Sequence, residues 1–284
     1  MRATVSVIVP FLGDAAQAEA LMGRLAALSR APGDELIVAD NTPESVVEAP
    51  VESAVTVVAV PDRRSAAHAR NAAAATASGD WLLFLDADCV APAGLLDSFL
   101  EPPPGDRCAI VAGEVVGDPA QKAILPRWAR SRRGPWVAGS RIEGMPAAAI
   151  TANMLVRREA FESAGGFRLG GGADFDLSWR LQDDGWQLEY RPQALVHHHD
   201  RETLREVAAQ ARSYGSDLRN LRRAHGSEVA RPRLLRSGRA LGGAAVWLAR
   251  GQLESSRFAL VDAVYHASAW LGFVLGGPRS RRAD

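Results

Sequence analysis

The sequence predicts an α/β fold built on a mostly parallel sheet with helices on both faces. Two observations indicate this fold class. Short, continuously apolar runs typical of buried strands alternate, along the first hundred residues, with segments whose apolar residues recur at helical spacing. Several runs also end on a polar residue or a proline, which suits strands whose carboxyl ends meet at one edge of a sheet, where such folds bind ligands.

Local composition justifies the elements of the first hundred residues in turn. Val5–Pro10 is rich in β-branched residues, and in 15–28 the leucines at 21, 25 and 28 share one helical face. The remaining elements of this part are a strand at 35–40, a strand at 55–61, an alanine-rich helix at 65–78 and a strand at 81–88. The last strand follows a Gly-Asp turn and stops before Pro92.

The pattern is less regular from residue 101 to residue 200. EPPPG at 101–105 indicates a loop, 109–116 a strand, and 120–145 a long loop, because that segment is rich in Arg, Gly and Trp without clean periodicity. Residues 147–161 predict a strand that leads into a helix. A glycine-rich loop then precedes a helix at about 174–184, whose first turn carries acids that suit the helix dipole.

The tail predicts three helices, at about 201–225, 235–254 and 258–275. The third has the length needed to span a bilayer, but the internal Asp262 argues against spanning. We expect it to lie on a membrane surface with its basic end near anionic headgroups, and packing against the main domain is an equally good alternative. The simplest division is a main domain at 1–215 and a basic helical extension at 216–284.

Composition and charge limit the classes of function that the protein could have. Apolar residues make up 47% of the 284, so general disorder is excluded, and the net charge is zero. Residues 1–200 nevertheless hold 18 basic against 26 acidic side chains, and 201–284 hold 15 against 7. Two cysteines in unrelated contexts form neither a disulfide framework nor a zinc pattern, and MRATVSVIVPF is too short for a secretory leader. We therefore expect a reducing, cytoplasmic compartment, with peripheral attachment to the inner face of the plasma membrane.

The stretch WLLFLDADCV carries the strongest chemical signal. Asp86 and Asp88 end an apolar strand and are separated by one alanine, so in an extended segment both carboxylates point the same way. Buried carboxylates are costly unless a cation, hydrogen-bond donors or water compensate them. The residues alone leave these three alternatives open.

Six segments, in this order, resemble the family-two glycosyltransferases of the GT-A fold. They are VSVIVPF, IVADN, AAHARNAAAATASGDWLLFLDAD, ITANMLVRREAFESAGGF, ADFDLSWRL and ALVHHHDRETLRE. Each is weak evidence alone, whereas the ordered set, which covers roughly residues 5–214, is specific. The resemblance implies a GT-A fold and an inverting, metal-dependent transfer of sugar from a nucleotide-diphosphate donor, most often a UDP-sugar, to an acceptor hydroxyl.

The resemblance also assigns the metal site. It implies that Asp86, Asp88 and His198 bind Mg²⁺ or Mn²⁺, with Asp88 the better candidate for a direct ligand and Asp86 for contact with ribose or a metal-bound water. Hard oxygen ligands suit both ions. His198 is selected because the family places a histidine two residues after an apolar valine, whereas a chance surface tract of histidines is the alternative.

The same resemblance also implies which residues contact the nucleotide-sugar donor. Pro10 and Phe11 open the loop where the family packs the nucleotide base. Asp40 resembles the acid that accepts a hydrogen bond from the base, although an acid that caps a turn is the alternative. Arg70 lies in an Ala-Arg-Asn element and is expected either to contact the nucleotide or to support Asp86.

Asp174 matches the general base of the family. Inversion needs a base on the face of the sugar opposite the leaving group. The glutamate that usually precedes it is replaced by Ala173, which removes a second carboxylate. Asp176 is expected to cap the helix or hold Arg180. For stacking on a sugar acceptor, the candidates are Trp128, Trp136 and Trp179, with core packing the default for the last.

Other functions fit less well. A nucleotidyltransferase or a nicotinamide dehydrogenase would carry a glycine-rich loop after the first strand, and IVPFLGDAAQ has none. A catalytically silent protein that binds sugar nucleotides would not need all the site residues together. We expect the acceptor to be a glycan, a lipid-linked molecule or a small molecule, with assembly of cell-surface glycans as one role, and we expect no nucleic acid partner.

Overall fold

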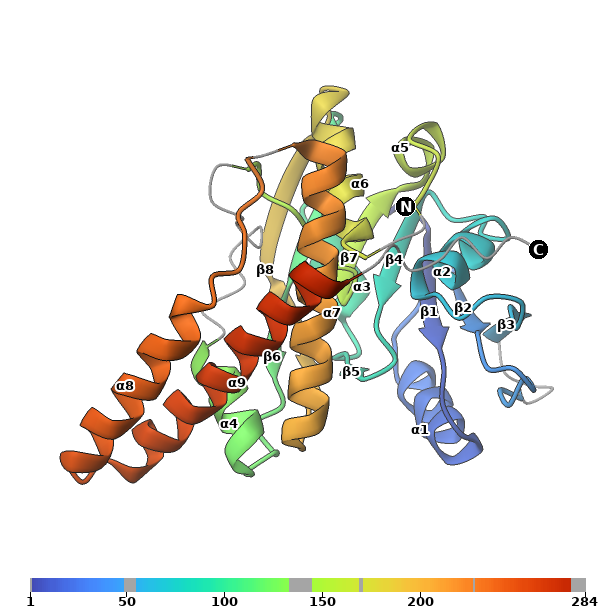
Figure 1. Ribbon diagram of the computed structural model, residues 1–284. Helices are drawn as coiled ribbons and strands as arrows, with labels where there is room; N and C mark the ends of the chain where they lie inside the picture. The colour runs from blue at the N-terminus through green and yellow to red at the C-terminus, as the bar shows by residue number, and fades with distance from the viewer. Residues whose placement is uncertain (1, 49–54, 133–144, 169–170, 227, 277–284) are drawn as a thin grey trace.

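A single eight-stranded sheet organises the described part of the chain. The structure, a computed structural model, describes residues 2–48, 55–132, 145–168, 171–226 and 228–276 (Figure 1). The strand order is β3-β2-β1-β4-β7-β6-β8-β5. The strands are β1 (Val5–Phe11), β2 (Glu35–Asp40), β3 (Val55–Ala59), β4 (Trp81–Leu85), β5 (Cys89–Val90), β6 (Cys108–Gly117), β7 (Asn153–Arg157) and β8 (Gln187–His198).

The sheet contains both parallel and antiparallel strand pairs, and its half formed by β1 to β4 is parallel. β1 pairs in parallel with β2 and β4, β2 with β3, and β6 with β8, whereas β7 runs antiparallel to both β4 and β6, and β5 runs antiparallel to β8. The carboxyl ends of β1, β2 and β4 therefore meet at one edge. The predicted α/β class and mostly parallel sheet are confirmed.

Helices cover both faces because successive residues of the central strands point to opposite sides. Val7 and Val9 of β1 pack in one cluster with residues of α1 and α3, and Ile8 packs in the other with residues of α2, α5 and α6. All three side chains are at most 1% exposed. The helices are α1 (Ala15–Ala26), α2 (Ala66–Ala74), α3 (Leu95–Leu100), α4 (Ile124–Arg132), α5 (Arg158–Ser163), α6 (Ala173–Asp183), α7 (Leu204–His225), α8 (Leu235–Ala249) and α9 (Leu253–Leu275).

Several sequence-based predictions differ from the structure. The helix predicted at 235–254 ends at Ala249, and β8 is not predicted. The sequence predicts a loop at 120–145, but α4 occupies 124–132, because Leu125 and Trp128 share a face that packs on Val207 and Val261. Residues 133–144 lie outside the described part. The last helix begins at Leu253 rather than near 258.

Helix α9 packs against α7, α4 and α8. By length and composition α9 could cross a membrane. About a third of its most apolar 18-residue stretch is buried inside the protein. Its Asp262 accepts hydrogen bonds from the indole of Trp128 (2.8 Å) and from Arg132 (2.5 Å), both in α4. In Figure 1, α8 and α9 run side by side and extend away from the sheet. The expected boundary between residues 215 and 216 falls inside α7, and a separate extension stays a proposal.

Two glycines allow α7 and α9 to cross in close contact. A Cβ at Gly272 would lie 1.9 Å from the carbonyl oxygen of Arg212, and a Cβ at Gly215 would lie 1.8 Å from that of Ala269. Both obstacles are backbone atoms, which cannot rotate away. The crossing therefore depends on the absence of side chains at these two positions.

We expect Gly272→Ala to destabilise the protein by about 1–3 kcal/mol, because the added methyl forces the two helices apart. Thermal and chemical unfolding measure the effect. Gly243→Ala in α8 is the matched control, because a Cβ there meets nothing within 4 Å, and we expect it to be neutral or slightly stabilising. Equal stability of the two variants would contradict the packing of α9 on α7.

Candidate active site

Asp86, Asp88 and His198 form a group that could hold a metal ion. One ligand atom from each lies within 4.8 Å of the others. Strand pairing explains why these three side chains lie close together. Asp86 and Asp88 follow β4, and the next two residues form β5. In β5, Cys89 pairs with His198 at the end of β8. The backbone N–H of His199 also donates to the carbonyl of Asp88 (2.9 Å). Strand pairing thus brings together residues 110 positions apart.

The donor atoms of this group fit a divalent cation. Nε2 of His198 lies 3.3 Å from Oδ1 of Asp88, yet that buried oxygen has no hydrogen-bond partner among the described residues. On the other side of the imidazole, Nδ1 lies 3.6 Å from Asp200, whose side chain is buried. A carboxylate behind a histidine is the usual way in which a metal-binding imidazole is oriented. Beside this imidazole, whose Nδ1 lies beyond hydrogen-bond distance of Asp200, a buried carboxylate oxygen without a hydrogen bond is what a cation would complete.

Arg70, in α2, forms an ion pair with one of the acids of this group. Its guanidinium pairs with Asp86, and the arginine is only 8% exposed. Its Nε is buried without a hydrogen bond in the described structure. The positive charge of the same guanidinium favours the ionised form of Asp174 and acts to lower its pKa, so Arg70 influences both sets of acids. Contact of Arg70 with a nucleotide stays a prediction.

Asp40 caps the loop that follows β2. Its two carboxylate oxygens accept the backbone N–H groups of Thr42 and Val47, each at 2.9 Å, and the residue is fully buried. Burial opposes ionisation, but these hydrogen bonds prevail and lower the pKa of Asp40. Phe11, beside Asp40 in the parallel register, packs in the core, and Pro10 is partly buried. Contacts of these three residues with a nucleotide base stay predictions.

Asp174 lies in the first turn of α6. The helix begins after Gly172, whose φ of +77° favours glycine. Burial raises the pKa of Asp174, although the backbone N–H of Phe175 and the charge of Arg70 act in the opposite direction. The N–H of Phe175 donates to its carboxylate at 3.0 Å. A partly desolvated carboxylate with a raised pKa suits a general base.

Asp176 anchors α6 to the rest of the domain. It is 5% exposed and accepts from Nε of Arg180 at 2.9 Å, as expected from the sequence. It also contacts Arg168 at 3.4 Å and Nε2 of His225, in the last turn of α7, at 3.0 Å. The contact with His225 was not anticipated, because 49 residues separate the two and no local pattern links them.

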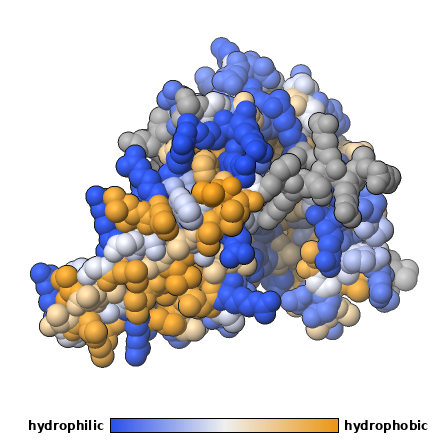
Figure 2. Space-filling model, in the orientation of Figure 1, coloured by the Kyte–Doolittle hydropathy of each residue, from blue (hydrophilic) through white to orange (hydrophobic). Residues whose placement is uncertain are grey.

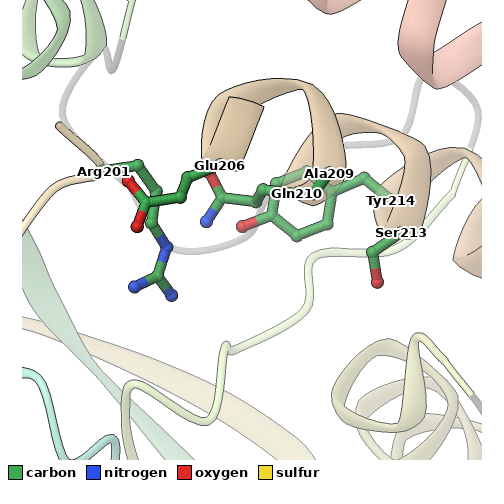
Figure 3. Close-up of a pocket in the computed structure, with 6 residues that line it drawn as sticks. All are labelled: Arg201, Glu206, Ala209, Gln210, Ser213 and Tyr214. Atoms are coloured by element: carbon green, nitrogen blue, oxygen red, sulfur yellow. The ribbon is translucent and has the colours of Figure 1, made fainter. Parts of the chain in front are cut away.

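A pocket of about 360 Å³ lies along α7 next to the acidic group (Figure 3). Arg201 connects the two, because its Nη2 lies 3.4 Å from Oδ2 of Asp88. The lining residues, labelled in Figure 3, are Arg201, Glu206, Ala209, Gln210, Ser213 and Tyr214. Sequence patterns did not indicate this pocket.

Two of the three tryptophan candidates for sugar stacking are buried in the protein interior. Trp179 is 1% exposed and donates its indole N–H to the carbonyl of Pro146 (2.9 Å), so core packing, the default expectation, holds. Trp128 is 7% exposed and packs between α4 and α9. Trp136 lies outside the described residues.

Comparison with known proteins places this geometry in a family. The family model described as glycosyl transferase family 2 matches residues 6–164, more than half of the chain. A pre-mycofactocin glycosyltransferase of Mycobacterium tuberculosis is 30% identical over 240 residues, which cover 80% of this chain and 49% of that protein. The chain thus spans about half the length of the curated relatives it matches.

Two solved structures share the fold. A mannosyltransferase of Pyrobaculum calidifontis, in complex with GDP-Man and Mn²⁺, has a TM-score of 0.60 at 19% identity and covers 94% of this chain and 88% of its own. Glucosyl-3-phosphoglycerate synthase of Mycobacterium tuberculosis, in complex with Mn²⁺, uridine diphosphate and glucosyl-3-phosphoglycerate, has a TM-score of 0.50 at 21% identity and covers 81% of each chain.

The expected GT-A fold is confirmed by these likenesses, which concern the fold alone. The ordered motifs and the family match agree with it. This chain belongs to glycosyl transferase family 2.

Proposed function

We propose that this protein transfers a sugar from a nucleotide-diphosphate donor, a UDP-sugar by preference, to an acceptor hydroxyl with inversion at the anomeric carbon. The observation that carries the proposal is the meeting of Asp86, Asp88 and His198, with Arg70 paired to Asp86 and acting electrostatically on Asp174. This arrangement supports a site in which a leaving diphosphate and a base would lie close to each other.

Asp86, Asp88 and His198 would hold Mg²⁺ or Mn²⁺. The ion, when bound, would neutralise the negative charge that develops on the leaving diphosphate. Two structures that share the fold contain Mn²⁺ with a nucleotide or nucleotide sugar, in support of this assignment. Asp200 would orient the imidazole of His198, and Arg201 would supply a further positive charge beside Asp88.

Donor binding would engage the residues around the strand ends. Pro10, Phe11 and Asp40 would line the position of the base, and Arg70 and Asp86 would contact the ribose and diphosphate. Because Asp40 already accepts two backbone N–H groups, only its remaining lone pairs could accept from a base N–H.

Asp174 would accept the proton of the acceptor hydroxyl. Its carboxylate must be ionised to do so, and the raised pKa makes it a stronger base than an exposed aspartate. Asp176 would position it by fixing the start of α6 through Arg180 and His225. With Ala173 in place of the usual glutamate, the acceptor would receive no second carboxylate from that position.

The proposal includes a glycan, lipid-linked or small-molecule acceptor, with cell-surface glycan assembly as a role, and a cytoplasmic location at the inner face of the plasma membrane. The alternative is a catalytically silent protein that binds sugar nucleotides. Turnover separates the two, because a silent protein would bind the donor and release no nucleoside diphosphate.

Asp88→Ala is expected to abolish the effect of Mn²⁺ on donor binding, because it removes a direct ligand. Loss of even an outer partner of a metal ligand typically costs about 10–100-fold in metal affinity, so the loss here should be at least that large. Calorimetric titration of UDP with and without Mn²⁺ measures it. The control is Asp106→Ala, an exposed acid before β6. Unchanged Mn²⁺ dependence in Asp88→Ala would refute the metal assignment.

Asp174→Asn is expected to keep UDP binding and lose at least about 100-fold in turnover, because asparagine cannot take the proton. The readouts are calorimetric donor binding and release of nucleoside diphosphate from the donor sugar. Wild-type turnover in this variant would show that another residue is the base.

The same substitution should stabilise the protein near neutral pH. The folded-state pKa of Asp174 lies above its ordinary value of 3.8, so the folded protein holds this proton more tightly than the unfolded chain. The associated stability is present below 3.8 and lost as pH rises through the raised pKa. Melting temperatures should therefore favour Asp174→Asn at pH 7, with the difference shrinking in acid; a variant less stable than wild type at pH 7 would contradict this.

A further inference from the structure

The C-terminal helices expose most of the large apolar side chains found on the described surface. We call residues 234–275, which comprise α8 and α9, the α8–α9 hairpin. Thirteen large apolar side chains are exposed in the described residues, and nine belong to this hairpin, so the exposure is concentrated rather than scattered. They are Leu234, Leu235, Leu241, Val246, Leu248, Leu253, Leu260, Val274 and Leu275. Figure 2 shows the resulting apolar surface at the lower left.

The inner side of the hairpin is made of small residues. In α8 only Ser237 and Ala244 are buried, and serine hydroxyls fasten the two helices: Ser237 donates to the carbonyl of Ala263 (2.7 Å), and Ser256 to that of Ala244 (2.9 Å). A hairpin of a water-soluble protein normally buries its large apolar residues in the seam. Here small residues pack inside and leucines point outward, as in helices that face lipid.

The surface around these leucines is positively charged. From residue 229 to 253 the sequence has no Asp or Glu, and it has five arginines. All five are exposed, and within the described part of the chain none pairs with a carboxylate. They are Arg231, Arg233, Arg236, Arg239 and Arg250. Exposed arginines interleaved with leucines match a surface that is both apolar and anionic.

Two other arrangements fit less well. Crossing a bilayer would require α8, 15 residues or roughly 22 Å long, to span a hydrocarbon core of about 30 Å, and would strip Asp262 of its partners in α4. A second copy seated on the same face would bring together two arginine-rich α8 surfaces without acidic residues, and like charges oppose that contact.

We propose that the α8–α9 hairpin lies flat on an anionic lipid bilayer, with its exposed leucines in the boundary between headgroups and acyl chains and its arginines against lipid phosphates. This inference rests on the membrane location in the proposed function and identifies the surface and the lipid chemistry responsible. Lipid binding is measured without sugar transfer, so failure of this inference can be told apart from failure of the proposed enzyme activity.

The test is co-sedimentation of the full chain with vesicles of phosphatidylcholine, with and without phosphatidylglycerol. One variant combines Leu235→Ser with Leu248→Ser, and another combines Arg236→Glu with Arg239→Glu. The matched charge control combines Arg30→Glu with Arg64→Glu, two exposed arginines on the main domain. Circular dichroism and thermal unfolding establish that each variant is folded.

We expect the wild type and the control to sediment with anionic vesicles, with less binding to neutral vesicles and at high salt. Each hairpin variant should lose about tenfold or more of its bound fraction. Wild-type protein that stays in the supernatant, or hairpin variants that bind like wild type, would overturn the proposal. A dimer that the leucine variant disrupts, found by light scattering without vesicle binding, would overturn it in favour of a second copy.

Discussion

Two carboxylates on alternate residues after a buried strand repel each other, and both lose water as the strand is covered. Side chains from distant parts of the chain, two of them arginines, offset this cost. Arg70 of α2 pairs with Asp86, Arg201 approaches Asp88, and the imidazole of His198 lies beside them both. One buried oxygen of Asp88 still lacks a hydrogen bond in the described structure, so these partners leave room for a divalent ion.

Helix α7 connects the parts of the molecule on which this site depends. It begins just after Arg201, beside the acidic group, and its last turn places His225 on Asp176, two residues from Asp174. Between these ends, Gly215 allows α9 to cross at backbone contact. The group of Asp86, Asp88 and His198, the helix that carries Asp174 and the α8–α9 hairpin therefore all contact α7, and a hairpin that rests on a bilayer would orient these residues relative to it.

Much of the parallel half of the fold, and the order of the motifs, could be predicted from the sequence because they depend on local composition. The strand that ends at Asp40 and the helix that begins near Asp174 follow from apolar runs and turn residues. Local patterns missed β8, in which Pro192 and Gln193 interrupt the apolar alternation at a register shift opposite β6. They also missed the contact between His225 and Asp176, which depends only on tertiary packing.

Titration of the protein with Mn²⁺, followed by electron paramagnetic resonance of the free ion, tests the central claim most directly. In the presence of UDP the account predicts that the free-ion signal is depleted by one ion per chain, and that His198→Ala removes the depletion while the fold is retained. A signal that the wild-type protein leaves unchanged, or that both proteins deplete equally, would contradict the claim that Asp86, Asp88 and His198 hold a catalytic cation.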